Sequence, residues 1–137
     1  MRVARRRRMA APSCAGVERA SPSADRIGPR RRPQRPDLVF VSGQGPFDPA
    51  SGAIVGETIR DETRQALTNC EAILQAAGSS MAKVVNASFI LRDGADFAGM
   101  NEEWVRWFPT DPPARQGAKH ALDVEGLRIS IALVAEA

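Results

Sequence analysis

The last apolar segment, Leu127–Ala135, constrains the fold most, because neither face of the β-strand it predicts is strongly polar. Alternate side chains of a strand point to opposite faces of its sheet. One face would carry Ile129, Ile131 and Leu133, and the other Ser130, Ala132 and Val134. A sheet with two water-poor faces needs a cover on each side. Helices of this chain can supply one cover, so the pattern predicts an oligomer in which a partner supplies the other.

The remaining segments predict two helices and four further strands. Thr58 and Asp61 match a capping box, Gly78 suits a helix end, and the apolar positions between them recur at helical spacing. The predicted order is strand–strand–helix–strand–helix–strand–strand, which indicates an α+β layer with two helices on one face of a sheet. The predicted strands are 38–42, 53–55, 84–91, 114–121 and 127–135, and the predicted helices are about 58–78 and 95–108.

Within the strand 84–91, the alternation predicts which side chains meet the helices. Val85, Ala87, Phe89 and Leu91 fall on one face, which we expect to pack against the helical layer.

Residues 1–36 differ from the rest of the chain in composition and charge. They hold five of the ten prolines, and 11 arginines against Glu18 and Asp25, a net charge of +9. Residues 37–137 hold 8 basic and 14 acidic side chains, a net charge of −6. A segment so poor in long apolar side chains cannot offset its chain entropy by burial. We therefore expect a disordered leader at 1–36 and a single folded domain at 37–137.

The leader admits three interpretations. It could be an Arg-rich, acid-poor transit peptide that directs the protein to an organelle. It could be a nucleic-acid-binding arm, since Arg5–Arg8 and Arg30–Arg32 would attract phosphates, whereas the acidic body would not. It could also be a solvated or non-native start of the chain.

The side chains that usually carry chemistry are sparse. Cys14, Cys70 and His120 give no metal-ligand spacing and no expected disulfide, so we expect no metal and a reducing, cytoplasmic compartment. His120 is expected at a strand edge, and Glu102 and Glu103 on a solvated helix face. No stretch approaches the roughly 20 apolar residues that cross a bilayer, so no membrane partner is expected.

Five short motifs follow one another through the body. They are Val41-Ser42-Gly43-Gln44, Thr63-Arg64-Gln65-Ala66-Leu67-Thr68-Asn69, Ala76-Ala77-Gly78, Asp96-Phe97 with Met100-Asn101, and Pro113-Ala114-Arg115. In this order they resemble the Rid (YjgF) family of imine deaminases, some of which are called endoribonuclease L-PSP-like. The resemblance implies a chorismate-mutase-like layer of a mixed β-sheet with two helices on one face. It also implies a homotrimer with a central barrel, active sites in clefts between subunits, and no cofactor.

The resemblance also assigns candidate site residues. In Rid enzymes the arginine of the Pro-Ala-Arg motif grips the substrate carboxylate, so Arg115 is the leading candidate, and guanidinium suits this role because it can bind both oxygens. Ser42 and Gly43 match pocket-lining positions, and Asn101 matches another residue at the cleft. The structural alternatives are a solvent-exposed Arg115, a turn hydroxyl at Ser42 and a local helix cap at Asn101.

The chain departs from the family pattern in three regions. Many deaminating members carry a Glu-x-Glu pattern on the last strand, where this chain reads Arg128-Ile129-Ser130-Ile131-Ala132. Both glutamates are missing, and Ser130 occupies the place of the functional one. Many members have cysteine where this chain has Gly117, whose backbone could still bind water or the leaving nitrogen. Ile27-Gly28-Pro29 resembles the family's first strand, but Arg30 replaces its aromatic residue and regular pattern resumes at Asp37. A frame error upstream of Asp37 would produce this break, which corresponds to the third interpretation of the leader, a non-native start; the other two interpretations stay open.

The implied reaction is hydrolysis of a reactive 2-imino acid to a 2-oxo acid and ammonia. Arg115 would anchor the carboxylate, and a water near Gly117 and Ser42 would attack the imine carbon. One alternative is a trimer that binds small carboxylates without turnover, which the missing glutamate favours. A further alternative is RNA binding or cleavage, or inhibition of translation, for which only the basic leader argues.

Overall fold

A computed structural model describes residues 37–137, and the leader with the expectations placed on it lies outside the described residues. The described elements are β1 (Leu38–Gln44), α1 (Ile59–Ala76), the 3₁₀ turn η2 (Met81–Lys83), β2 (Val84–Leu91), the 3₁₀ turn η3 (Gly94–Asp96), α2 (Phe97–Trp107), β3 (Ala114–Lys119) and β4 (Ile129–Glu136).

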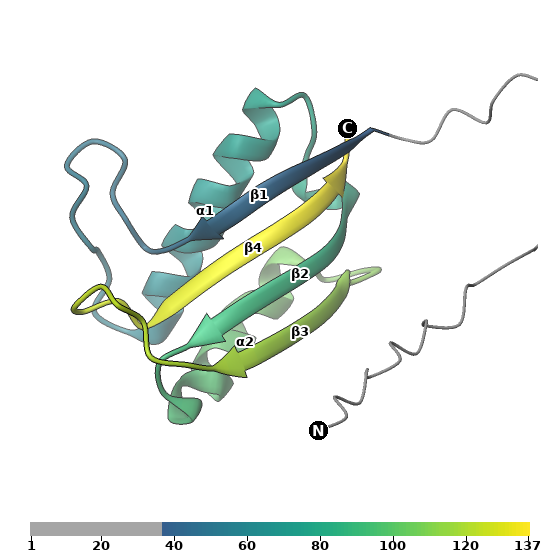
Figure 1. Cartoon of the computed structure of the whole chain (residues 1–137). Helices are drawn as coiled ribbons and strands as arrows, with labels where there is room; N and C mark the ends of the chain where they lie inside the picture. Colours follow the sequence, from purple (N-terminus) through teal and green to yellow (C-terminus); the bar gives the residue numbers. More distant parts are fainter. Residues whose placement is uncertain (1–36) are drawn as a thin grey trace, which may run out of the picture. The chain divides into compact units, whose positions relative to one another are not determined.

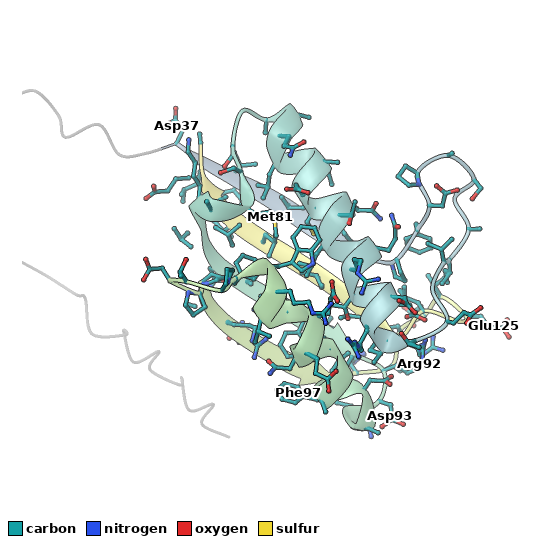
Figure 2. The ribbon with its side chains drawn as sticks, turned by 180° about the vertical axis from the view of Figure 1, so that it is seen from behind. Asp37, Met81, Arg92, Asp93, Phe97 and Glu125 are labelled. Atoms are coloured by element: carbon teal, nitrogen blue, oxygen red, sulfur yellow. The ribbon has the colours of Figure 1, made fainter. Side chains whose placement is uncertain are left out.

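The strands form one mixed sheet in the order β1-β4-β2-β3. β4 pairs antiparallel with both β1 and β2, whereas β3 runs parallel to β2 at the edge. Figure 1 shows both helices behind this sheet, and Figure 2 shows them in front of it from the opposite side. The α+β layer with two helices on one face is therefore confirmed.

The first helix begins and ends where the sequence predicts. The Thr58 hydroxyl accepts a hydrogen bond from the backbone N–H of Asp61, and the Asp61 carboxylate accepts one from the Thr58 backbone, so the capping box is complete. Gly78 follows the helix with a φ of +80°, a left-handed conformation that glycine adopts without strain. Alternate residues of β4 pack under this helix, and Ile129, Ile131, Leu133 and Ala135 are buried.

One of the side chains of β2 predicted to face the helices does not do so. Ala87, Phe89 and Leu91 are buried on the helix side as expected, but Val85 is 44% exposed and its neighbour Val84 is buried instead. The pairing of β2 with β4 shifts register between residues 84 and 86, so an extra residue enters the strand there. Such a bulge reverses the alternation on one side of it, which periodicity alone does not predict.

Several boundaries also differ from prediction. The expected hairpin strand at 53–55 is wrong, because only Ile54 makes an isolated bridge, to Phe47. The second α-helix begins at Phe97 rather than at 95, after the 3₁₀ turn that the Asp93 side chain caps. The last strand begins at Ile129 rather than at 127, and the strand before it ends at Lys119 rather than at 121.

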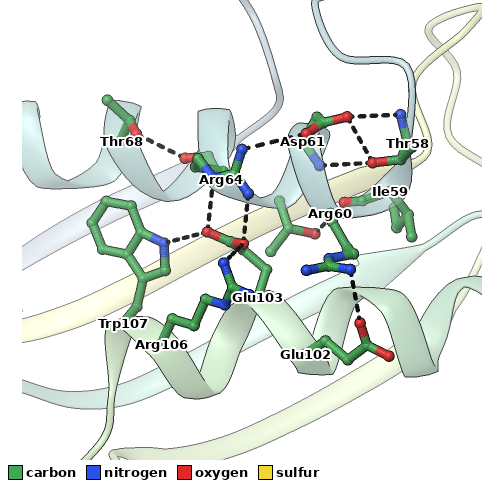
Figure 3. Close-up of polar contacts among 11 residues, drawn as sticks. Thr58, Ile59, Arg60, Asp61, Arg64, Thr68, Glu102, Glu103, Arg106 and Trp107 are labelled. Atoms are coloured by element: carbon green, nitrogen blue, oxygen red, sulfur yellow. Dashed lines mark hydrogen bonds and ion pairs between the residues drawn. The ribbon is translucent and has the colours of Figure 1, made fainter.

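A buried carboxylate joins the two helices (Figure 3). Glu103 on α2 is 2% exposed, so the expectation of a solvated position is wrong for it. Its carboxylate accepts hydrogen bonds from Arg64 Nε at 3.0 Å and Nη2 at 2.9 Å, and one from Trp107 Nε1 at 3.2 Å. A neighbouring pair, Arg60 with Glu102 at 3.2 Å, also links the helices but lies in solvent.

The second face of the sheet carries an apolar surface that no helix of residues 37–137 covers. It includes Phe40, Leu38 and Ile90, with Phe40 73% exposed. Exposed apolar side chains on one face of a sheet are typical of an interaction surface. Neither helix of the described part of the chain is long and apolar enough to span a membrane.

The two helix-linking carboxylates should differ in their contribution to stability. We expect Glu103→Gln to lower the free energy of unfolding by about 2 kcal/mol, because a buried charged acceptor of three hydrogen bonds is lost. The matched variant Glu102→Gln should change it by less than about 0.5 kcal/mol, because its ion pair is screened by water. Urea unfolding followed by circular dichroism measures both, and equal effects would contradict the difference in burial.

The same carboxylate predicts a pH dependence. Burial acts to raise the pKa of Glu103, but the hydrogen bonds from Arg64 and Trp107 and the nearby guanidinium charges more than offset it, so its pKa lies below 4.5. A pKa that is lower in the folded than in the unfolded chain stabilises the fold above the unfolded value. The stability difference between wild type and Glu103→Gln should therefore be constant above about pH 5 and shrink as the pH falls through the folded pKa. A difference that persists unchanged at pH 3 would contradict this.

Candidate active site

Arg115 lies on the edge strand β3, and its side chain points to the helix side of the sheet. In the parallel pairing of β3 with β2, Arg115 lies opposite Ala87, Gly117 opposite Phe89, and Lys119 opposite Leu91. Neighbouring residues of paired strands point to the same face. Because Ala87 and Phe89 face the helices, Arg115 and Gly117 also face them.

Three aromatic rings and one amide hold the Arg115 guanidinium. Its central carbon lies 5.0 Å from the ring centroid of Trp104, 5.5 Å from that of Phe89 and 6.0 Å from that of Phe97. Its Nη2 donates a 2.8 Å hydrogen bond to Asn101 Oδ1. Desolvation by these neighbours lowers the pKa of Arg115, but a guanidinium remains charged throughout the physiological range.

Asn101 occupies one of the five N–H groups of this guanidinium. The remaining groups can bind an anion, and the planar fork of arginine suits a carboxylate. Asn101 and the aromatic rings contact the guanidinium, but Arg115 is exposed to solvent, so its remaining N–H groups are accessible to a ligand. We call Arg115, Asn101 and Gly117 the helix-side group.

Gly117 is required by close packing rather than by backbone conformation. A Cβ at this position would collide with the ring of Phe89, which lies directly over the Gly117 backbone. Next to it lies a cleft of about 360 Å³, lined by Phe89, Leu91, Gly94, Phe97, Gly117, Ala118 and Lys119.

Ser42, Gly43 and Ser130 form a second cluster, the open-face group, on the opposite face of the sheet. Val41 pairs with Leu133 and Gln44 with Ile131, so Ser42 and Gly43 form a bulge between them. A Cβ on Gly43 would lie 2.7 Å from Ser130 Oγ, so these two residues are direct neighbours. Ser130 pairs with Ile90, which is exposed on the uncovered face.

The six predicted site residues are therefore divided between two faces of one sheet. Arg115 and Asn101 are in direct contact, and Gly43 approaches Ser130, but the two groups are separated by the sheet itself. The sequence analysis did not identify the contacts of Arg115 with the rings of Phe89, Phe97 and Trp104. The alternation of β2 and the apolar face of α2 already contained this signal, since both point toward the strand that carries Arg115.

The described part of the chain contains no cluster of three or more His, Cys, Asp or Glu side chains placed to hold a metal ion. The helix-side group and the open-face group offer guanidinium, amide, hydroxyl and backbone hydrogen-bond donors. This chemistry suits binding of a small carboxylate and of a water molecule.

Comparison with known proteins places the chain in a family. Residues 33–137 match the family described as Endoribonuclease L-PSP. A RutC family protein of Pyrococcus horikoshii is 46% identical over 79 residues, which are 58% of this chain and 63% of that protein, so the chain spans less than two thirds of that relative's length. The human 2-iminobutanoate/2-iminopropanoate deaminase is 38% identical over 97 residues, 71% of each chain.

Solved structures agree with these sequence matches. The crystal structure of the YjgF gene product of Escherichia coli superimposes with a TM-score of 0.67 at 29% identity, over 72% of this chain and 80% of that one. With the family matched over more than half of its length, this chain belongs to the Endoribonuclease L-PSP family, the Rid (YjgF) family that its five motifs resemble.

Proposed function

We propose that this protein hydrolyses reactive 2-imino acids to 2-oxo acids and ammonia. The observation that carries the proposal is the state of Arg115, a permanent cation oriented by Asn101 and three aromatic rings and retaining N–H groups for a ligand. The names of the deaminases to which the chain is similar support the same reaction.

In the proposed reaction, Arg115 holds the substrate carboxylate and thereby places the C=N carbon. A water oxygen bonds to this carbon while the C=N π electrons move to nitrogen, which takes up a proton. The resulting carbinolamine loses the nitrogen as ammonia, the hydroxyl proton is released, and the C=O bond of the 2-oxo acid forms. Protonated imines are strong electrophiles, so orienting one water supplies much of the acceleration.

The water would be held by hydroxyl and backbone groups rather than by a carboxylate. Ser42, Ser130 and the backbone at Gly117 are the candidates. General acid–base assistance contributes typically 10²–10⁴-fold, so a chain with Ser130 in place of a glutamate should be a slower enzyme than one with the carboxylate.

The division of the site residues between two faces leads us to propose a homotrimer. If the apolar open face of one subunit docks against a neighbour, its Ser42, Gly43 and Ser130 leave solvent and can meet the helix-side group of another subunit. This arrangement explains both the exposed Phe40 and the separation of the groups, and it corresponds to the trimer with a central barrel that the family resemblance implies.

A second candidate is a trimer that binds small carboxylates without turnover. The hydroxyl at Ser130 favours it, because a serine is a weak base for activating water. The acidic character of residues 37–137 gives an RNA-binding or RNA-cleaving function no comparable support.

Arg115 should be required for turnover. With 2-iminopropanoate generated in situ by an amino-acid oxidase, we expect Arg115→Ala to lower kcat/KM about 100-fold, because two charge-assisted hydrogen bonds are lost. Arg115→Lys should recover only part of this, because ammonium lacks the bidentate geometry. Release of the 2-oxo acid measures the rate.

A matched control separates this role from general loss of positive charge. Arg60→Ala removes the charge of an arginine that pairs with Glu102 in solvent, and it should leave kcat/KM unchanged. If the folded wild-type protein gives no acceleration, the deaminase proposal fails and the carboxylate-binding candidate replaces it.

The trimer makes a separate prediction. We expect light scattering to give three times the 14.8 kDa chain mass for the wild type. Phe40→Glu should dissociate the assembly, because a charge on the docked apolar face is not solvated there. Ile73→Glu, at an exposed apolar position of α1, should remain trimeric. A monomeric wild type would contradict the proposal.

A further inference from the structure

We propose that the cleft beside Arg115 selects 2-imino acids with a large apolar, especially aromatic, side chain. The inference rests on the proposed deaminase function and names its substrate class. It depends on the neighbourhood of Gly117, where this chain carries glycine under an aromatic ring.

The cleft and the guanidinium share two walls. Phe89 and Phe97 line the cleft and also lie within 6.0 Å of the Arg115 guanidinium carbon, measured to their ring centroids. Their own centroids are 6.1 Å apart with an interplanar angle of 37°. A carboxylate on Arg115 therefore places the rest of a small ligand against these rings.

The lining is almost entirely apolar. Of its seven residues only Lys119 is charged, and the others are Phe89, Leu91, Gly94, Phe97, Gly117 and Ala118. Its volume of about 360 Å³ lies within the range of small-molecule sites, which runs from roughly 300 to 1,000 Å³. Phe97, one of the lining residues, is 46% exposed.

Gly117 and Gly94 both line this cleft. The ring of Phe89 occupies the position of any side chain at residue 117, so the wall there is a flat phenyl face over bare backbone. Gly94 has nothing within 4 Å of the place where a Cβ would stand. A methyl substituent on the substrate leaves most of the cleft to water, whereas a phenyl or isobutyl substituent buries apolar surface in it.

The test compares three substrates in the full-length protein. The 2-imino acids derived from alanine, leucine and phenylalanine are generated in situ, and kcat/KM is measured for each. Affinity for the corresponding 2-oxo acids is measured by calorimetry. We expect the phenyl compound to exceed the methyl compound at least tenfold in kcat/KM, since a hydrophobic pocket discriminates to this extent for the removal of a single methylene. Its 2-oxo acid should bind correspondingly tighter.

Two variants assign the preference to the cleft. Gly94→Leu places a side chain in open space at the cleft wall and should reduce the phenyl-to-methyl ratio at least fivefold. Ala95→Leu, at the neighbouring exposed position that does not line the cleft, should leave this ratio unchanged. Circular dichroism and light scattering check that both variants remain folded and retain the wild-type assembly.

The outcomes separate the two proposals. Turnover with equal or better rates for the methyl compound overturns the side-chain inference and leaves the deaminase intact. No turnover, together with tighter binding of the phenyl 2-oxo acid that Gly94→Leu abolishes, overturns the deaminase and keeps the cleft as a ligand site. No turnover and no binding preference overturns both.

Discussion

The sheet has a helical layer on only one side, and the arrangement of the site follows from this. β4 buries Ile129, Ile131, Leu133 and Ala135 beneath the helices, while its other side chains join Phe40 and Ile90 on a face that the described chain leaves open. Burial of apolar surface is the main favourable contribution to folding. The same imbalance places Arg115 on one side of the sheet and Ser130 on the other, so these two candidate residues do not meet within one subunit.

The helices determine where the side chains of the helix-side group lie. Asn101 and Trp104, which orient Arg115, both lie on α2, and α2 is held to α1 through the buried Glu103 carboxylate and the guanidinium of Arg64. A buried acid of this kind is costly unless it is fully hydrogen-bonded. Here three donors satisfy it, so the placement of α2 depends on a specific polar geometry in addition to apolar packing.

One of the aromatic side chains that contact Arg115 also belongs to the core. Phe89 belongs to the core, yet its ring also covers Gly117 and lines the cleft. One side chain therefore packs the sheet, supports the cation and shapes the adjoining space. A substitution of Phe89 would alter the core packing, the contact with Arg115 and the shape of the cleft together.

Local signals in the sequence determined much of this architecture. The capping box at Thr58, the glycine at 78 and the alternation of β4 each act through neighbours in the chain, so their outcomes could be predicted without tertiary information. The motif resemblance assigned Arg115 and Asn101 to the site separately, and the hydrogen bond between them was not predicted.

Only the tertiary structure decided the rest, because these features depend on contacts between distant segments. The bulge that exposes Val85 arises from pairing with β4, and the burial of Glu103 arises from a partner 39 residues away on another helix. The separation of the six site residues onto two faces depends on strand order and register, which no local pattern in the sequence encodes.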